Sequence, residues 1–155
     1  MDSIVFRLAV QSDLYRIASL HTESWRSSYR GILPDTYLDR EIAEEREQLW
    51  KARFSKLGID RRYVLLAEIN MKLIGFVCVL LDEEPAWGAC LDNLHVCPEL
   101  KGQGLGRQLF VRGTRWVMGK NRIGLFTFGS LKPTTLQGGF MKHLRAPLSS
   151  VKSRN

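Results

Sequence analysis

No aspartate or glutamate follows Glu99 in this chain, although residues 101–155 contain eleven lysines and arginines. The first hundred residues hold sixteen acidic and twelve basic side chains, so the net charge of +7 arises entirely after residue 100. Such one-sided basic charge is typical of a surface for nucleic acid or a site for a polyanionic cofactor. The cationic residues are scattered over an expected helix and an irregular tail, without interleaved aromatics along a strand, so we expect no nucleic-acid partner.

The chain also lacks a long apolar run at its N-terminus and closely spaced cysteines. The segment that begins with Asp2 has neither the apolar core of a signal peptide nor the length of a membrane span, which predicts a cytoplasmic protein with no membrane partner. Cys78, Cys90 and Cys97 are odd in number and have no CxxC spacing. We expect buried, reduced thiols rather than a disulfide or a metal site.

The composition that is present is that of one soluble globular domain: 155 residues, 45% hydrophobic and 25% charged. Residues 4–9 have the composition of a strand, and residues 14–20 have apolar positions at helical spacing. Gly31 and Pro34 end this first helix. Residues 39–58 then resume a helical period, and we interpret their charge run as a solvated face.

Three β-rich runs follow. Residues 62–69 and 72–81 are joined by a link too short for anything but a tight turn, so they are predicted to form an antiparallel hairpin, with residues 89–96 as a third strand. Residues 105–120 have a helical period and residues 123–128 form a further strand. The prediction is an α/β (α+β) fold with a mixed, mostly antiparallel sheet flanked by helices.

A glycine-rich turn separates the third of these strands from its helix. Gly102, Gly104 and Gly106 open the helix soon after Pro98. Backbone amides without neighbouring side chains can approach an anion closely, and a helix N-terminus adds positive partial charge, so the turn favours a pyrophosphate. The spacing fits neither a nucleotide P-loop nor a Rossmann fingerprint. A connector without a ligand is the alternative interpretation.

The stretch LDNLHVCPELKGQGLGRQLF resembles the acyl-CoA loop of the GNAT superfamily of N-acetyltransferases, in which V-x-P is followed by Arg or Gln, then xxGxG and a helix. Lys101 occupies the Arg or Gln position, while Gly104 and Gly106 match. This lysine keeps the charge but lacks the forked donors of arginine. The resemblance covers residues 4–128, and residues 21–38 are similar to the first-helix region of a common bacterial branch.

The resemblance implies acetyl-CoA as co-substrate and no metal. In the family acetyl-CoA lies where two central parallel strands splay apart, here residues 89–96 and 123–128 of an acyl-CoA-binding domain at 1–128. The pantetheine arm would pair with exposed backbone of one strand, and the pyrophosphate would meet the amides of the loop. The residues implied for the strand are Leu94, His95 and Val96, and those for the loop are Lys101, Gly102, Gln103, Gly104, Leu105, Gly106 and Arg107.

The implied reaction is direct acetyl transfer to a primary amine, without a covalent enzyme intermediate. It requires a base for the ammonium group, donors for the oxyanion and an acid for the leaving thiolate. Asp92, His95 and Glu99 could act as the base. We favour Asp92 because a period of two places it on the same strand face as Leu94 and Val96, with His95 opposite. A solvated carboxylate without a catalytic role is the alternative.

Trp25 and Tyr29 lie four residues apart on the first expected helix and therefore share a face. The corresponding region lines the acceptor pocket in similar enzymes, which makes both residues candidates for the acceptor site. Packing in the core is the alternative. Neither the acceptor amine nor the oligomeric state follows from the sequence.

The usual continuation of the family is missing after the last expected strand. Family members have a NxxAxxFYE segment there, whose tyrosine acts as general acid, whereas residues 129–155 show no sustained period and form an irregular tail. Codons for residues 131–142, read from each third base, permit EANHPARRFYE. We hypothesise that a one-base shift near residues 126–130 replaced the C-terminus.

This hypothesis leaves a second function open. A chain without the general acid would be a non-catalytic or weakly active acyl-CoA-binding remnant. An unpaired sheet edge beside residues 123–128 would also favour a homodimer.

Overall fold

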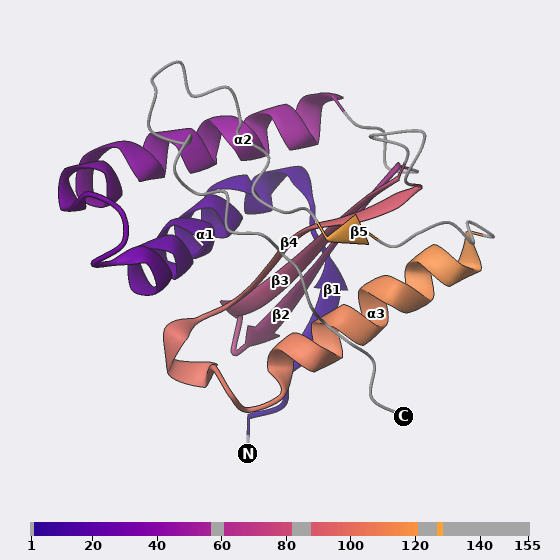
Figure 1. Ribbon diagram of the computed structural model, residues 1–155. Coiled ribbons are helices and arrows are strands. Elements are labelled where there is room, and N and C mark those ends of the chain that lie inside the picture. The colour runs from indigo at the N-terminus through magenta and orange to yellow at the C-terminus, as the bar shows by residue number, and fades with distance from the viewer. Residues whose placement is uncertain (1, 57–60, 82–87, 121–126, 129–155) are drawn as a thin grey trace, which may run out of the picture.

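The computed structural model describes residues 2–56, 61–81, 88–120 and 127–128, which include a five-stranded sheet in the order β1-β2-β3-β4-β5 (Figure 1). The first four strands pair antiparallel, and β4 and β5 pair parallel. The predicted mixed, mostly antiparallel sheet is therefore confirmed. The strands are β1 (Val5–Leu8), β2 (Arg62–Ile69), β3 (Lys72–Leu81), β4 (Ala89–Val96) and β5 (Thr127–Phe128).

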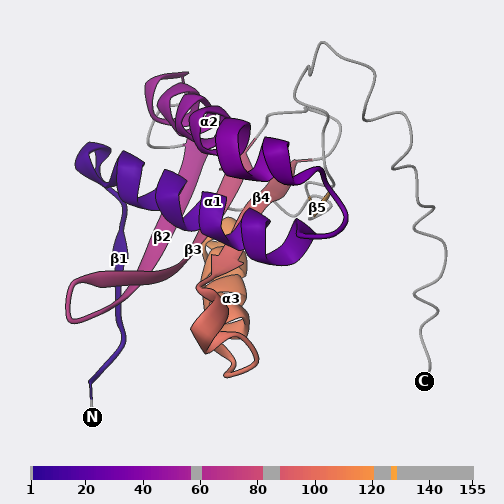
Figure 2. The same cartoon turned by 90° about the vertical axis from the view of Figure 1, so that its left-hand side faces the viewer.

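Helices cover both faces of the sheet (Figure 2). The helices α1 (Leu14–Tyr29) and α2 (Ile42–Lys56) lie on one face, and α3 (Leu105–Gly119) lies on the other. A π-helical turn, Tyr37–Glu41, leads directly into α2. The helices and strands predicted from periodicity up to residue 120 are thus all present. Residues 123–126 of the predicted last strand, the tail 129–155 and the domain boundary between them lie outside the described residues.

The hairpin of β2 and β3 closes through two residues with left-handed backbone. Asn70 has φ of 49° and Met71 has φ of 62°, and the two residues link Ile69 and Lys72, which form the last pair of the hairpin. Two successive positive φ values are typical of the type I′ turn, whose twist matches that of the strands. The tight antiparallel hairpin predicted for this segment is therefore confirmed.

The alternation of side chains along the strands separates two cores. The core under α3 includes Leu65, Val77, Val79, Leu91 and Leu109. The core under α1 and α2 includes Ile17, Trp50, Leu66, Phe76 and Leu80. Because successive residues of a strand face opposite ways, β2 and β3 each contribute to both cores.

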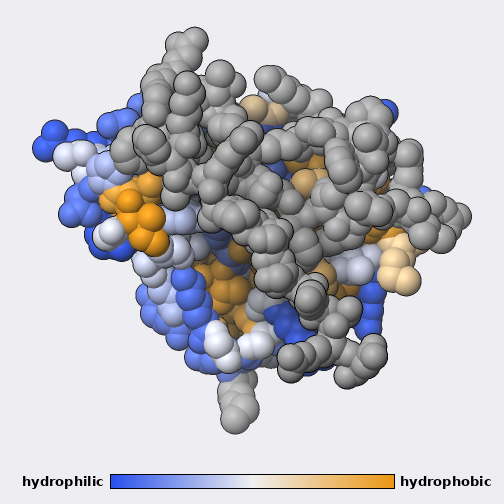
Figure 3. Space-filling view, viewed as in Figure 1, coloured by the Kyte–Doolittle hydropathy of each residue, from blue (hydrophilic) through white to orange (hydrophobic). Residues whose placement is uncertain are grey.

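The outer surface near the turn between α1 and α2 is mainly hydrophilic. Figure 3 shows this side largely in blue, interrupted by a small apolar area, and Ile32 of the turn is 62% exposed. Glu44 and Lys51 of α2 are exposed, as expected for a solvated face, whereas Arg46 is buried. The solvated-face interpretation is therefore only partly correct.

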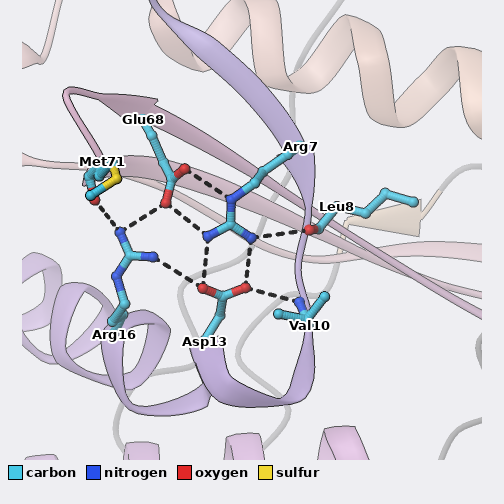
Figure 4. Close-up of polar contacts among 7 residues, drawn as sticks. All are labelled: Arg7, Leu8, Val10, Asp13, Arg16, Glu68 and Met71. Carbon is cyan, nitrogen blue, oxygen red and sulfur yellow. Dashed lines mark hydrogen bonds and ion pairs between the residues drawn. The ribbon is translucent and has the colours of Figure 1, made fainter.

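Two arginines and two carboxylates connect β1, the start of α1 and β2 (Figure 4). The Arg7 guanidinium donates to both Asp13 oxygens at 2.8 Å and to both Glu68 oxygens at 2.9 Å. Arg16 contacts the same two carboxylates, at 3.0 Å and 2.8 Å. Bidentate pairing of this kind combines charge with fixed geometry, so this cluster holds the edge strand against the first helix.

The cluster predicts that stability depends on pH. The Arg7 hydrogen bond, with smaller contributions from Val10 and Arg16, lowers the pKa of Asp13 to about 2. A depressed carboxylate pKa contributes stability above the unfolded value of 3.8, and that contribution is lost as pH falls towards 2. Asp13→Asn is expected to lower the free energy of unfolding by about 2 kcal/mol at pH 7 and by much less at pH 2.

Urea unfolding of both proteins at the two pH values measures this difference. Asp35→Asn is the matched control, since the Asp35 side chain also pairs with an arginine but is 70% exposed. It is expected to change stability little at either pH. If Asp13→Asn lowered the free energy of unfolding equally at pH 2 and pH 7, the carboxylate charge would not be the source of the lost stability.

Candidate functional site

The turn that leads from β4 to α3 takes its shape from two glycines. Gly102 has φ of 81° and Gly104, the residue before the helix, has φ of 83°. Both positions have open space where a Cβ would lie, so the left-handed backbone alone favours glycine there. Gly106 differs, because its φ is not positive and a Cβ would make only an ordinary contact with Val96, at 3.8 Å.

The amides of this turn form a group of unpaired donors. The first backbone bond of α3 runs from the Gln108 amide to the Gly104 carbonyl, at 3.1 Å. Within the described parts of the chain, no oxygen accepts from the amides of residues 102–107. The first amides of a helix have no intrahelical partner and carry its positive partial charge, so this arrangement can bind an anion.

The side chains of the turn lie at the surface. Lys101, Gln103 and Arg107 are exposed. Lys101 Nζ donates to Ser28 Oγ of α1 at 3.3 Å, and Gln103 Nε2 donates to the Glu99 carbonyl at 3.4 Å. These weak contacts leave the cationic groups available to an anion at the amides.

One edge of β4 is open in the described structure. β5 pairs with β4 only at Cys90↔Thr127 and Leu91↔Phe128. On that edge, residues 93–96 have no strand partner among the residues described here. This stretch of backbone is where the sequence analysis expects the pantetheine arm. Leu94 and Val96 direct their side chains to the α3 core, and His95 directs its ring to the α1 side.

Asp92 does not lie on the predicted face. The β3–β4 register changes from Cys78↔Asn93 to Val79↔Leu91, so Asp92 is an extra residue in β4. A bulge breaks the period of two. Asp92 accepts from Arg53 of α2, at 2.7 Å, and from the Asn93 side chain. The expectation that Asp92 shares a face with Leu94 and Val96, opposite His95, is wrong: Asp92 and His95 are both on the side of α1 and α2.

His95 is held as a neutral imidazole. Its Nδ1 lies 2.8 Å from Ser24 Oγ, and its ring centroid lies 4.4 Å from that of His21. Burial, with a smaller contribution from the charges of Arg46 and Lys101, lowers the pKa of His95 to about 4. At neutral pH the ring is therefore uncharged and cannot supply a cation to the site.

His21 is a buried residue that the sequence interpretation did not single out. Trp50 Nε1 donates to His21 Nδ1 at 3.1 Å, and burial lowers the pKa of His21 to about 2. The available signal was its position on the apolar stripe of the first helix, four residues after Ile17. A satisfied and neutral histidine at that position packs between the helices and the sheet.

The two aromatic candidates on α1 lie together. The ring centroids of Trp25 and Tyr29 are 4.7 Å apart, so the shared helix face predicted for them is confirmed. The Arg46 guanidinium lies over the Trp25 ring, with Cζ 4.6 Å from the centroid. The charge of Arg46 predicts exposure, but its position midway between Ile42 and Trp50 places it on the buried stripe of α2.

Comparisons with known proteins place the chain in a family. The sequence model of the Acetyltransferase (GNAT) family matches residues 14–133, so this chain belongs to the GNAT acetyltransferase family. An uncharacterized N-acetyltransferase, YuaI, of Bacillus subtilis (strain 168) is 26% identical over 127 residues, which cover 81% of this chain and 70% of that protein. The family predicted from the glycine loop is thereby confirmed.

Two solved structures are similar in fold and were determined with a coenzyme. The PaiA N-acetyltransferase from Thermoplasma acidophilum, in complex with coenzyme A, has a TM-score of 0.63 and 26% identity, over 77% of this chain and 75% of that one. A GNAT family acetyltransferase from Brucella melitensis, in complex with acetyl-CoA, has a TM-score of 0.62 and 19% identity, over 86% and 80%.

Among the described residues, no group of three or more His, Cys, Asp or Glu side chains could hold a metal ion. No helix in those ranges is long and apolar enough to cross a membrane. Cys78 and Cys97 are buried and Cys90 is half-buried, and no disulfide joins any two of these three cysteines.

Proposed function

We propose that this chain transfers an acetyl group from acetyl-CoA to a primary amine. The observation that supports this most directly is the run of amides at residues 102–107 that have no acceptor among the described residues, next to the stretch of β4 that has no strand partner there. In the reaction, the amine nitrogen forms a bond to the thioester carbonyl carbon and the carbon–sulfur bond breaks. The ammonium proton goes to a base before the attack, and the second proton that the nitrogen loses on becoming an amide is balanced by the one that the CoA thiolate takes up.

Each part of acetyl-CoA has a proposed partner. The pyrophosphate lies against the amides from Gly102 to Arg107, with the charges of Lys101 and Arg107 nearby. The pantetheine arm follows the backbone of residues 94–96 along the open edge of β4. Backbone donors carry most of this binding, which explains why the turn needs glycine rather than a particular side chain.

Asp92 is the proposed base, acting directly or through a water molecule. Arg53 fixes the orientation of its carboxylate at 2.7 Å. His95 is the weaker candidate because its Nδ1 already has Ser24 as a partner and its pKa is lowered by burial. Trp25 and Tyr29 are proposed to contact the acceptor.

The binding step is tested by Gly104→Ala. Alanine at φ of 83° is strained, so the turn is expected to change shape and the dissociation constant for CoA to rise about tenfold or more. Isothermal titration calorimetry with CoA measures this constant. Gly31→Ala is the matched control, since Gly31 has φ of 82° and equally open space but lies far along the chain from the turn.

Both variants are expected to lose similar stability, and only Gly104→Ala should lose CoA affinity. Equal CoA binding by the two variants would contradict the role of the turn. Failure of the unaltered chain to bind CoA would contradict the proposed function itself.

A second function is favoured by one feature of the sequence. Because residues 129–155 lack the family's NxxAxxFYE motif, the chain could bind acyl-CoA with little or no turnover. CoA binding without release of thiol from acetyl-CoA, measured with a panel of amines, distinguishes this remnant from an active enzyme.

A further inference from the structure

Arg46 is a buried charge with an incomplete set of partners. Arg46 is only 7% exposed, and its Nε atom is buried without a hydrogen-bond partner in the described parts of the chain. A buried polar group without a partner costs free energy, and a buried charge costs more, so nearly all such groups in proteins are paired. An unpaired guanidinium nitrogen in this position therefore requires an explanation.

The contacts that Arg46 does make are weak or shared. Its NH2 group lies 3.4 Å from Glu45 Oε2, at the long end of the hydrogen-bond range. The same oxygen accepts a much shorter bond, of 2.6 Å, from the Tyr37 hydroxyl. A further contact is the face of Trp25, which attracts a cation but accepts no conventional N–H bond. The guanidinium is thus oriented by its neighbours but only partly neutralised.

The position of Arg46 connects it with the proposed site of acetyl transfer. Trp25, which it covers, is a candidate for the acceptor site. Its charge contributes to the lowered pKa of His95, and the charge of Asp92 acts in turn on Arg46. Arg46 and the β4 residues therefore lie within electrostatic range, on the same side of the sheet.

We infer that the amine acceptor carries a carboxylate, which Arg46 binds with its free donor positions. This inference rests on the proposed function, because it names the class of acceptor for the same site. A planar guanidinium matches a carboxylate through two parallel N–H bonds. A diamine would bring a second cation towards Arg46, and a simple alkylamine would leave Nε unpaired. The acceptor class is a small amino-carboxylate such as a free amino acid.

The test compares each amino acid with its primary amide. The amide keeps the amine and the side chain but loses the anionic group, so the pair isolates the carboxylate. With the CoA-loaded chain, we expect at least one amino acid to bind about 10- to 100-fold more tightly than its amide. Calorimetry measures binding, and thiol release from acetyl-CoA measures kcat and KM for the same compounds.

Two variants assign the preference to Arg46. Arg46→Met is expected to remove it, mainly through KM and with little change in the affinity for CoA, while Arg46→Lys restores part of it. If Arg46 served only to stabilise the fold, Arg46→Met would have a lower unfolding midpoint than the unaltered chain. We expect an equal or higher midpoint, because an apolar side chain replaces an incompletely paired charge.

Each outcome decides the inference separately from the proposed function. If CoA does not bind, the proposed function fails first. If CoA binds but amides and amino acids bind equally or not at all, the inference is wrong and the proposed function stands. The inference is also wrong if the preference survives in Arg46→Met.

Discussion

A gene in which the downstream reading phase is restored near residues 126–130 is expected to encode a protein with about 10²- to 10⁴-fold higher turnover of acetyl-CoA than this chain. The physical reason is the leaving group. A thiolate departs more easily when a positioned acid protonates it, and the shifted phase permits EANHPARRFYE, which contains the tyrosine that performs this role in the family. Steady-state thiol release by both proteins measures the difference.

The control for this experiment is the restored protein with the tyrosine of the motif replaced by phenylalanine. This variant should lose most of the gain in turnover, because its phenylalanine lacks the hydroxyl group that acts as the acid. Equal turnover by all three proteins would contradict the hypothesis of a missing acid. The nucleotide sequence gives an independent test, since codons for residues 131–142 that do not permit FYE in the shifted phase would exclude the hypothesis.

The second large effect is expected for Asp92→Asn. Asparagine has nearly the same shape but does not accept a proton, so kcat is expected to fall about 10²-fold or more while the affinity for CoA is unchanged. Stopped assays of thiol release between pH 6 and pH 9 measure kcat. At high pH, where more of the amine is already deprotonated, the difference between the two proteins should become smaller.

Asp92→Asn also removes the charge that pairs with Arg53, so a control is required. Arg53→Lys keeps the cation and alters the geometry of the same ion pair. If Asp92 is the base, Arg53→Lys should lower kcat much less than Asp92→Asn does. Similar losses for the two variants, constant over the pH range, would indicate that the ion pair supports structure and that another group accepts the proton.

Local patterns predicted most of the fold because they depend on neighbours in sequence. The hairpin followed from a link of two residues between β2 and β3, and α3 followed from the period of its apolar residues. The glycine turn was equally readable, since positive φ at Gly102 and Gly104 is a property of residue type. Once the glycine turn and the start of α3 are predicted, the lack of intrahelical partners for the first amides follows from helix geometry.

Features that depend on partners distant in sequence were not predictable in the same way. The bulge that moves Asp92 to the side of α2 arises from the pairing of β4 with β3, which a count along one strand does not contain. The burial of Arg46 depends on how α2 packs against α1. Its spacing from Ile42 and Trp50 gave the helix face, but its charge suggested the opposite environment.

The extra residue in β4 also bears on how such an enzyme can change during evolution. Leu94 and Val96 face one helix layer, while Asp92 and His95 face the other. Under the proposed function, mutations in α1 and α2 are expected to alter which amine is accepted, while the β4 backbone proposed to bind the coenzyme stays unchanged. The proposal thus divides the two tasks between the backbone of β4 and the side chains of the helical pair, and exchange of that pair between relatives is expected to change the acceptor.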